Sequence, residues 1–140
     1  MGAGPLPAYS AYASSKAAVV AFTESVAAEV ADKNIHVNAI APGFVPTRIH
    51  EATLAAGARA GRSLDTTKHA MESVKFEDAI NRVCELALFL ASSKSDGVTG
   101  RLFSAKWDDW KQMATALIEN PGSQVATVRR IDNERYVERA

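Results

Sequence analysis

Residues 9–16 read YSAYASSK and residues 35–43 read IHVNAIAPG, and these two segments, in this order, decide the fold. The first opens an alanine-rich run in which larger apolar residues recur at helical spacing, so we expect a long helix over residues 11–32. The second has apolar residues at every other position and ends at Pro42-Gly43, which predicts a strand at about 35–41.

Tyr12 and Lys16 lie four residues apart in the first segment, which is about one helical turn. The phenol and the ammonium would therefore share one face of the helix. A free tyrosine, with a pKa near ~10, is a poor acid–base group at neutral pH, and a neighbouring cation stabilises the phenolate and lowers that pKa. The pair is thus suited to proton transfer. Two exposed residues on a helix surface are the alternative interpretation of the pair alone.

The two segments, followed by Thr47, resemble the C-terminal half of a short-chain dehydrogenase/reductase (SDR). The resemblance continues to the turn Ser95–Gly100 and covers residues 1–105. It implies an α/β fold: the C-terminal portion of a Rossmann-like doubly wound parallel sheet, helix-rich, with few strands, at about 35–41 and 101–105. We expect a partial domain over residues 1–118 and a C-terminal tail over 119–140.

The resemblance also implies roles for individual residues. Tyr12 matches the family's acid–base residue, and Lys16 matches the lysine that binds the nicotinamide ribose and lowers the tyrosine pKa. The positions beside the nicotinamide are matched by Pro42, Gly43, Val45 and Thr47. The implied cofactor is NAD or NADP, and the implied substrate is a small-molecule alcohol or carbonyl compound.

Other parts of the family pattern are missing from the sequence. No G-x-G-x-x-G follows a predicted strand, and the family's catalytic Ser and Asn and its ribose-reading residue would precede Met1. Either the chain is a fragment or its start has been assigned too late. Because the cofactor diphosphate then has no helix N-terminus to bind, we expect negligible turnover by this chain alone.

Composition argues against several classes of function. Sixteen basic residues balance sixteen acidic ones, which gives no indication of nucleic acid or an acidic membrane surface as a partner. The sequence has no signal peptide and no apolar run near ~18 residues, and a single Cys84 fits a reducing cytosol, so we expect a cytoplasmic protein. Cys84 lies in an apolar helical stretch, so we expect it to be buried. We expect no metal site, because His36 has no second ligand at suitable spacing.

The family resemblance implies a homo-oligomer, because the family's long helix often packs against its copy in a partner subunit. With only two strands of a parallel sheet, the helix at 11–32 would keep an exposed apolar face, so we expect self-association. A non-catalytic interaction fragment that retains these oligomerisation helices is the alternative to an enzyme.

The segment 48–75 covers the substrate site in the resemblance. We expect a short helix near Ala52–Ala56 and a mobile stretch at Gly57–Thr67. Its basic residues would recognise an anionic or polyhydroxyl substrate, or would only face solvent; they are Arg48, His50, Arg59, Arg62 and His69. A further helix opens at Phe76, and a last one runs through about Ile118. The residues spaced to form one packed face of the last helix are Trp107, Trp110, Met113 and Leu117.

Overall fold

A computed structural model describes residues 7–127, which form five α-helices and two parallel strands. The helices are α1 (Ser10–Glu29), α2 (Arg48–Ala56), α3 (Arg62–Ser73), α4 (Phe76–Leu90) and α5 (Trp110–Glu119). The strands are β1 (Ala39–Ala41) and β2 (Leu102–Ser104), and short 3₁₀ turns lie at Ala31–Lys33, Gly57–Ala60 and Ser93–Ser95. Most of the tail expected at 119–140 lies outside the described residues.

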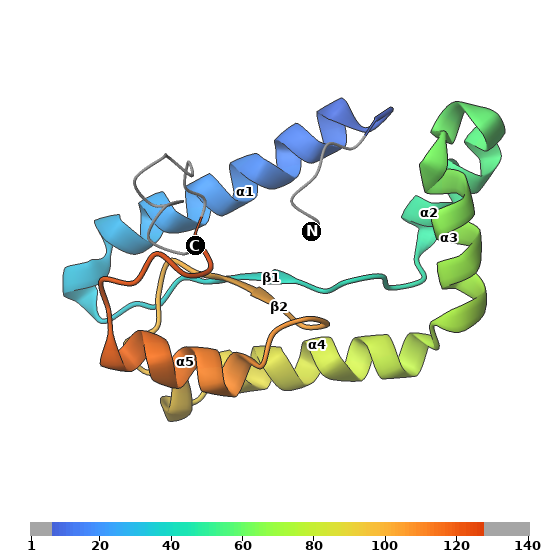
Figure 1. Cartoon of the computed structure of the whole chain (residues 1–140). Coiled ribbons are helices and arrows are strands. Elements are labelled where there is room, and N and C mark those ends of the chain that lie inside the picture. Colours follow the sequence, from blue (N-terminus) through green and yellow to red (C-terminus); the bar gives the residue numbers. More distant parts are fainter. Residues whose placement is uncertain (1–6, 128–140) are drawn as a thin grey trace, which may run out of the picture.

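The sheet is covered on both faces, as Figure 1 shows: α1 lies on one side of it, and α4 and α5 lie on the other. β1 and β2 run parallel, with Ala39 opposite Leu102 and Ala41 opposite Ser104. The pair α2–α3 stands beyond the end to which both strands point. Parallel strands between helices are the arrangement of a Rossmann-like α/β fold, so the predicted fold class is confirmed for this part of the chain.

Both strands are shorter than expected, because side chains take over the pairing at their start. The Asn38 amide donates to the Val98 carbonyl at 2.8 Å and accepts from the Arg101 N–H at 3.1 Å. The Val37 N–H donates to the Thr99 hydroxyl at 2.9 Å. The turn that precedes β2 therefore binds residues 37–38 without a regular ladder, and the backbone groups are still satisfied.

The hydrophobic core lies between the sheet and the pair α4–α5. Its largest fully buried side chains are Phe103 of β2, Leu86 of α4 and Val98, and Leu117 of α5 packs against them. The expected face of the last helix is confirmed for three of its four residues, since Trp110 and Met113 are partly buried here. The fourth, Trp107, precedes α5 and is 73% exposed, so that part of the prediction was wrong.

α1 approaches the sheet closely because the residues at the contact are small. A Cβ placed on Gly100, whose φ is +69°, would lie 3.3 Å from the Ala27 Cβ. The buried residues of α1 are only Val20, Thr23 and Ala27. Phe22, on the same helix, is 68% exposed. One face of α1 is therefore packed, and large apolar side chains remain on the other.

Two further expectations were wrong. The stretch expected to be mobile forms a 3₁₀ turn and the first half of α3, because Gly57 (φ +55°) and Gly61 (φ +56°) terminate elements where the sequence indicated flexibility. Cys84 is exposed, since it falls between the inward positions Val83 and Leu86 of α4.

Truncation of the central core residue should unfold the protein much more readily. We expect Phe103→Ala to lower the free energy of unfolding by about 3–5 kcal/mol, because the cavity left behind adds to the lost burial. Phe22→Ala removes the same atoms from an exposed position and should change stability by less than about 0.5 kcal/mol. Urea titration followed by circular dichroism measures both variants. Equal effects would contradict the location of the core.

Candidate active site

The first two turns of α1 bring Tyr12 and Lys16 together. The Lys16 Nζ lies 5.4 Å from the centroid of the Tyr12 ring, so the ammonium and the phenol share one face of the helix. Tyr12 is 39% exposed, and its hydroxyl makes no hydrogen bond within residues 7–127. The geometry therefore leaves this phenol accessible to a ligand.

A cavity of about 460 Å³ lies in front of that phenol. Its walls come from the start of α1, from α2 and from the first half of α3, and Tyr12, Thr53 and Thr67 all line it. Cavities that hold small-molecule ligands are typically of this size. Tyr12 is thus placed where it can reach a bound molecule.

One hydrogen bond ties the residue before α1 to α2 across this cavity. The hydroxyls of Tyr9 and Thr53 lie 2.7 Å apart, and Thr53 is buried. The Tyr9 ring meets the Tyr12 ring edge to face, with centroids 6.2 Å apart. Tyr9 therefore holds the wall of the cavity and fixes the ring beside it, while Tyr12 keeps its hydroxyl free.

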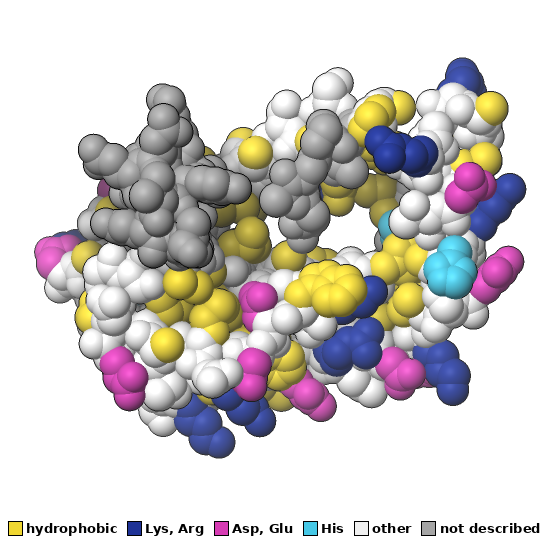
Figure 2. Space-filling model, in the orientation of Figure 1, with side chains coloured by type: hydrophobic (Ala, Val, Ile, Leu, Met, Phe, Trp, Pro, Cys, Tyr) yellow, Lys and Arg dark blue, Asp and Glu magenta, His cyan; other side chains and the backbone are white. Residues whose placement is uncertain are grey.

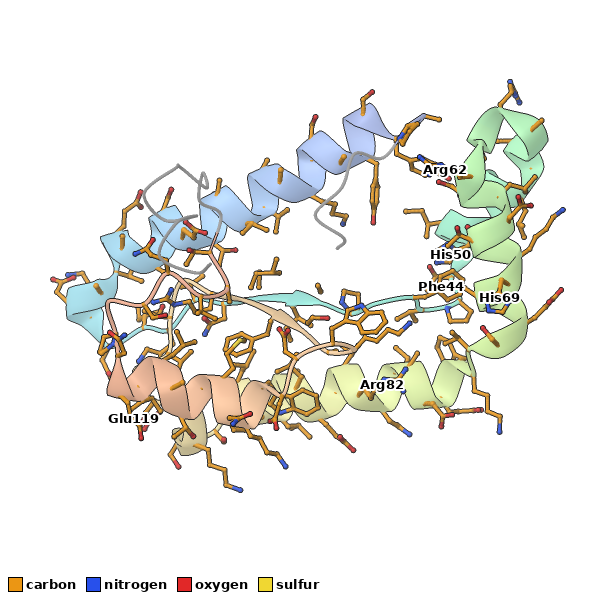
Figure 3. The ribbon with its side chains drawn as sticks, viewed as in Figure 1. Phe44, His50, Arg62, His69, Arg82 and Glu119 are labelled. Carbon is orange, nitrogen blue, oxygen red and sulfur yellow. The ribbon has the colours of Figure 1, made fainter. Side chains whose placement is uncertain are left out.

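His50 of α2 is held at the same site by two contacts (Figure 3). Its ring stacks on Phe44 with centroids 4.1 Å apart. Its Nε2 lies 3.0 Å from the Val45 carbonyl oxygen, and because a carbonyl only accepts, Nε2 carries the proton of this bond. These contacts join the cavity to the segment that leaves β1.

That segment, residues 42–47, runs from the end of β1 to α2. Gly43 has a φ of +77°, and a Cβ there would lie 3.1 Å from the Lys106 Cβ, so the turn needs glycine. Pro42 and Thr47 are exposed, and Val45 offers its carbonyl to His50. None of Pro42, Gly43, Val45 and Thr47 lines the cavity that Tyr12 lines.

The surface between the residues that line the cavity and residues 42–47 is open. Figure 2 shows an opening through the molecule that is bordered by α1, by α2–α3 and by the chain that follows β1.

The structure brings some of the residues that the sequence indicated to the cavity and leaves others away from it. It places Tyr12 and Lys16 together, and it brings His50 and Arg62 to the cavity, whereas Arg48, Arg59 and His69 do not line it. The sequence interpretation missed five residues with hydroxyl groups at the cavity: Tyr9, Thr53, Ser63, Thr66 and Thr67. Ser63, Thr66 and Thr67 have the three- and four-residue spacing of one helix face. This pattern was missed because the segment was not recognised as helical.

Other kinds of site find little support in the described part of the chain. No group of three or more His, Cys, Asp or Glu side chains in residues 7–127 is placed to hold a metal ion. His36 accepts a hydrogen bond from the Gly97 N–H at 3.2 Å, which is a structural contact. No helix within residues 7–127 has the length and apolar character needed to span a membrane.

Comparison with known proteins identifies the family of this chain. A family model described as enoyl-(acyl carrier protein) reductase matches residues 2–105. The 3-oxoacyl-(acyl-carrier-protein) reductase FabG of Thermotoga maritima is 38% identical over 96 residues, which are 69% of this chain and 36% of the relative. The oxidoreductase UcpA of Escherichia coli is 40% identical over 100 residues, or 67% of this chain and 36% of the relative. This chain belongs to the short-chain dehydrogenase/reductase family.

The match is to part of each relative. The chain spans little more than a third (36%) of the length of these curated relatives. A Drosophila melanogaster dehydrogenase/reductase SDR family protein 7-like is 37% identical over 76 residues, which are 54% of this chain and 23% of that protein. No solved structure matches the chain significantly.

The two tyrosines at the cavity should respond differently to loss of the hydroxyl. We expect Tyr9→Phe to lower the free energy of unfolding by about 1 kcal/mol, because the Thr53 hydroxyl loses its partner. Tyr12→Phe should change it by less than about 0.5 kcal/mol, because its hydroxyl has no partner within residues 7–127. Urea titration of the two variants makes the comparison. A larger loss for Tyr12→Phe would show that its hydroxyl is structural.

Proposed function

We propose that this chain is the substrate-binding and proton-transferring part of an NAD(P)-dependent oxidoreductase that interconverts an alcohol and a carbonyl compound. The observation that carries the proposal is the Tyr12 phenol, which lines a cavity of about 460 Å³ with the Lys16 ammonium 5.4 Å from its ring. Family membership supports oxidoreductase chemistry, since the matched relatives include a reductase and an oxidoreductase.

NADH or NADPH would supply a hydride to the carbonyl carbon, and the Tyr12 hydroxyl would donate its proton to the carbonyl oxygen; the reverse direction would oxidise the alcohol. Lys16 stabilises the phenolate that remains. The cofactor supplies the hydride, and the protein supplies position and electrostatics.

The residues present fit one end of the cofactor. Pro42 and Gly43 leave exposed backbone at the end of β1, where a flat nicotinamide can approach closely, with Val45 and Thr47 beside it. Lys16 is exposed on the side of α1 that carries Tyr12, within reach of ribose hydroxyls. The sequence holds no G-x-G-x-x-G, the motif that binds a dinucleotide diphosphate at a helix N-terminus.

The enzyme proposal is tested with a chimaera. Residues 2–105 replace the matched portion of the Thermotoga maritima reductase, and reduction of neutral methyl benzoylformate by NADH or NADPH is followed at the nicotinamide absorbance. We expect turnover, and we expect Tyr12→Phe to lower kcat by about 10²–10⁴-fold, the usual contribution of a positioned acid. Ser25→Ala, which removes an exposed hydroxyl of α1 outside the cavity, is the control and should stay within about threefold of the parent chimaera. A folded chimaera in which Tyr12→Phe is as active as its parent would refute the proposal.

The chain by itself should not bind the cofactor well. Titration of residues 1–140 with NADH or NADPH, followed by nicotinamide fluorescence, should give no saturable binding at micromolar concentration, because the diphosphate site is missing from the sequence. Tight binding would contradict this part of the proposal.

The exposed apolar side chains of α1 are the observation that favours the second candidate, a non-catalytic interaction fragment, and they are equally compatible with an oligomeric enzyme. Val19 and Phe22 are exposed on α1, and burial of such side chains drives association. We expect residues 1–140 to form dimers or larger species in light scattering at tens of micromolar, and V19S together with F22S to reduce their mass. Ile118→Ser, an exposed apolar position on α5, is the control. A monodisperse monomer in the unmodified chain would overturn this expectation.

A further inference from the structure

We propose that the substrate of this site carries an anionic group, a carboxylate, which the cavity binds with Arg62 of α3 and the neighbouring hydroxyls. The proposal rests on the proposed function, because it assigns the substrate class of the same cavity. It predicts a small oxo acid or hydroxy acid in place of a neutral ketone or alcohol.

The charge of the cavity is the first argument. Its lining includes Arg62 and His50, and no Asp or Glu side chain from the described residues. Arg62 is in no ion pair, since the salt bridge found in residues 7–127 joins Lys33 and Asp32. Figure 3 shows Arg62 at the start of α3, on the side of α1's N-terminal end. A guanidinium without a carboxylate partner presents a fork of N–H donors that matches a carboxylate.

The hydroxyl of Thr67 is the second argument. Thr67 lines the cavity and is 7% exposed, and its hydroxyl forms no hydrogen bond within residues 7–127. Its neighbour Thr66 donates to the Arg62 carbonyl one turn back at 3.1 Å, as threonines in helices commonly do. The Thr67 oxygen is not one of the enclosed polar atoms without a partner, so it is accessible from the cavity and free to bond to a bound oxygen.

The start of α3 adds a third, weaker contribution. This helix has 12 residues, begins at Arg62 and has no side-chain cap, so the positive end of its dipole lies at the wall that Arg62 and Ser63 form. The Leu64 N–H already donates to the Gly61 carbonyl at 3.1 Å, and Asp65 lies in the first turn and does not line the cavity. The same few residues thus supply a positive charge and hydroxyls to one wall.

The wall opposite Arg62 contains Tyr12, so an anion bound at Arg62 would lie in the same cavity as the proposed acid. Tyr12 lines the same cavity from α1, and the Tyr9–Thr53 hydrogen bond holds α1 and α2 around it. A molecule whose carboxylate binds at the start of α3 would have its carbonyl group directed toward the Tyr12 phenol. Arg62 is therefore assigned to substrate binding and Tyr12 to chemistry.

The test compares two probes that differ in one charge: benzoylformate, an oxo acid, and its neutral methyl ester. Binding of each to residues 1–140 is measured by NMR titration without cofactor, so turnover is not required. We expect benzoylformate to bind roughly tenfold more tightly than the ester, the effect of one charge-assisted hydrogen-bonded pair. The difference should shrink as KCl is raised, because salt screens exposed charges.

Arg62→Gln should bring the two affinities within about twofold of each other, and Arg62→Lys should restore part of the preference. Arg59→Gln is the matched control, because Arg59 is an exposed arginine three residues away that does not line the cavity. Thr67→Val should weaken benzoylformate by roughly threefold and leave the ester unchanged. Circular dichroism verifies that each variant is folded.

The outcomes separate this inference from the proposed function. Equal affinity for the two probes in the unmodified chain, or a preference that survives Arg62→Gln, would overturn the anion site even if the chimaera reduces the ester. An Arg62-dependent preference in a chain whose chimaera is insensitive to Tyr12→Phe would retain the anion site and reject the enzyme mechanism.

Discussion

The parallel pairing of β1 with β2 is the constraint from which the rest of the site follows. Two strands in the same direction end at the same edge, so the turn after β1 and the turn after β2 meet there, with Gly43 against Lys106. The connection from β1 to β2 must then cross back over the sheet, and α2, α3 and α4 lie in it. α1 runs back along the other face, so Tyr12 at its start reaches the same edge. The cavity thus assembles where residues from distant parts of the chain converge.

The sequence was most informative where one periodicity or one spacing decided the answer. The four-residue separation of Tyr12 and Lys16 needs only a helix to place both groups on one face, and α1 provides it. The broad apolar face of α4 and the packing of Leu117 follow from the same rule. The parallel direction of the strands came from the family resemblance, because local pattern does not fix strand direction.

What the sequence did not predict depended on contacts between distant segments. Nothing near Thr53 in the chain indicates that its hydroxyl meets Tyr9, 44 positions earlier. The glycines at 57 and 61 indicate flexibility by composition, but in the fold they end and begin helical elements at positive φ. Trp107 has the spacing of a helix face, yet it lies before the start of α5, and a boundary shift of one turn decides between core and surface.

The two ends of the site differ in how completely the described residues build them. At the substrate end, hydrogen bonds and stacking fix Tyr9, Thr53 and His50, and the lining is continuous from α1 to α3. At the proposed cofactor end, Pro42 and Gly43 are exposed, and β1 has a partner strand on one edge only within residues 7–127. An unpaired parallel strand exposes backbone donors and acceptors that a further strand would satisfy. The proposed binding of a substrate therefore rests on residues that pack against one another, whereas the proposed binding of a cofactor rests on a strand edge that has no partner within residues 7–127.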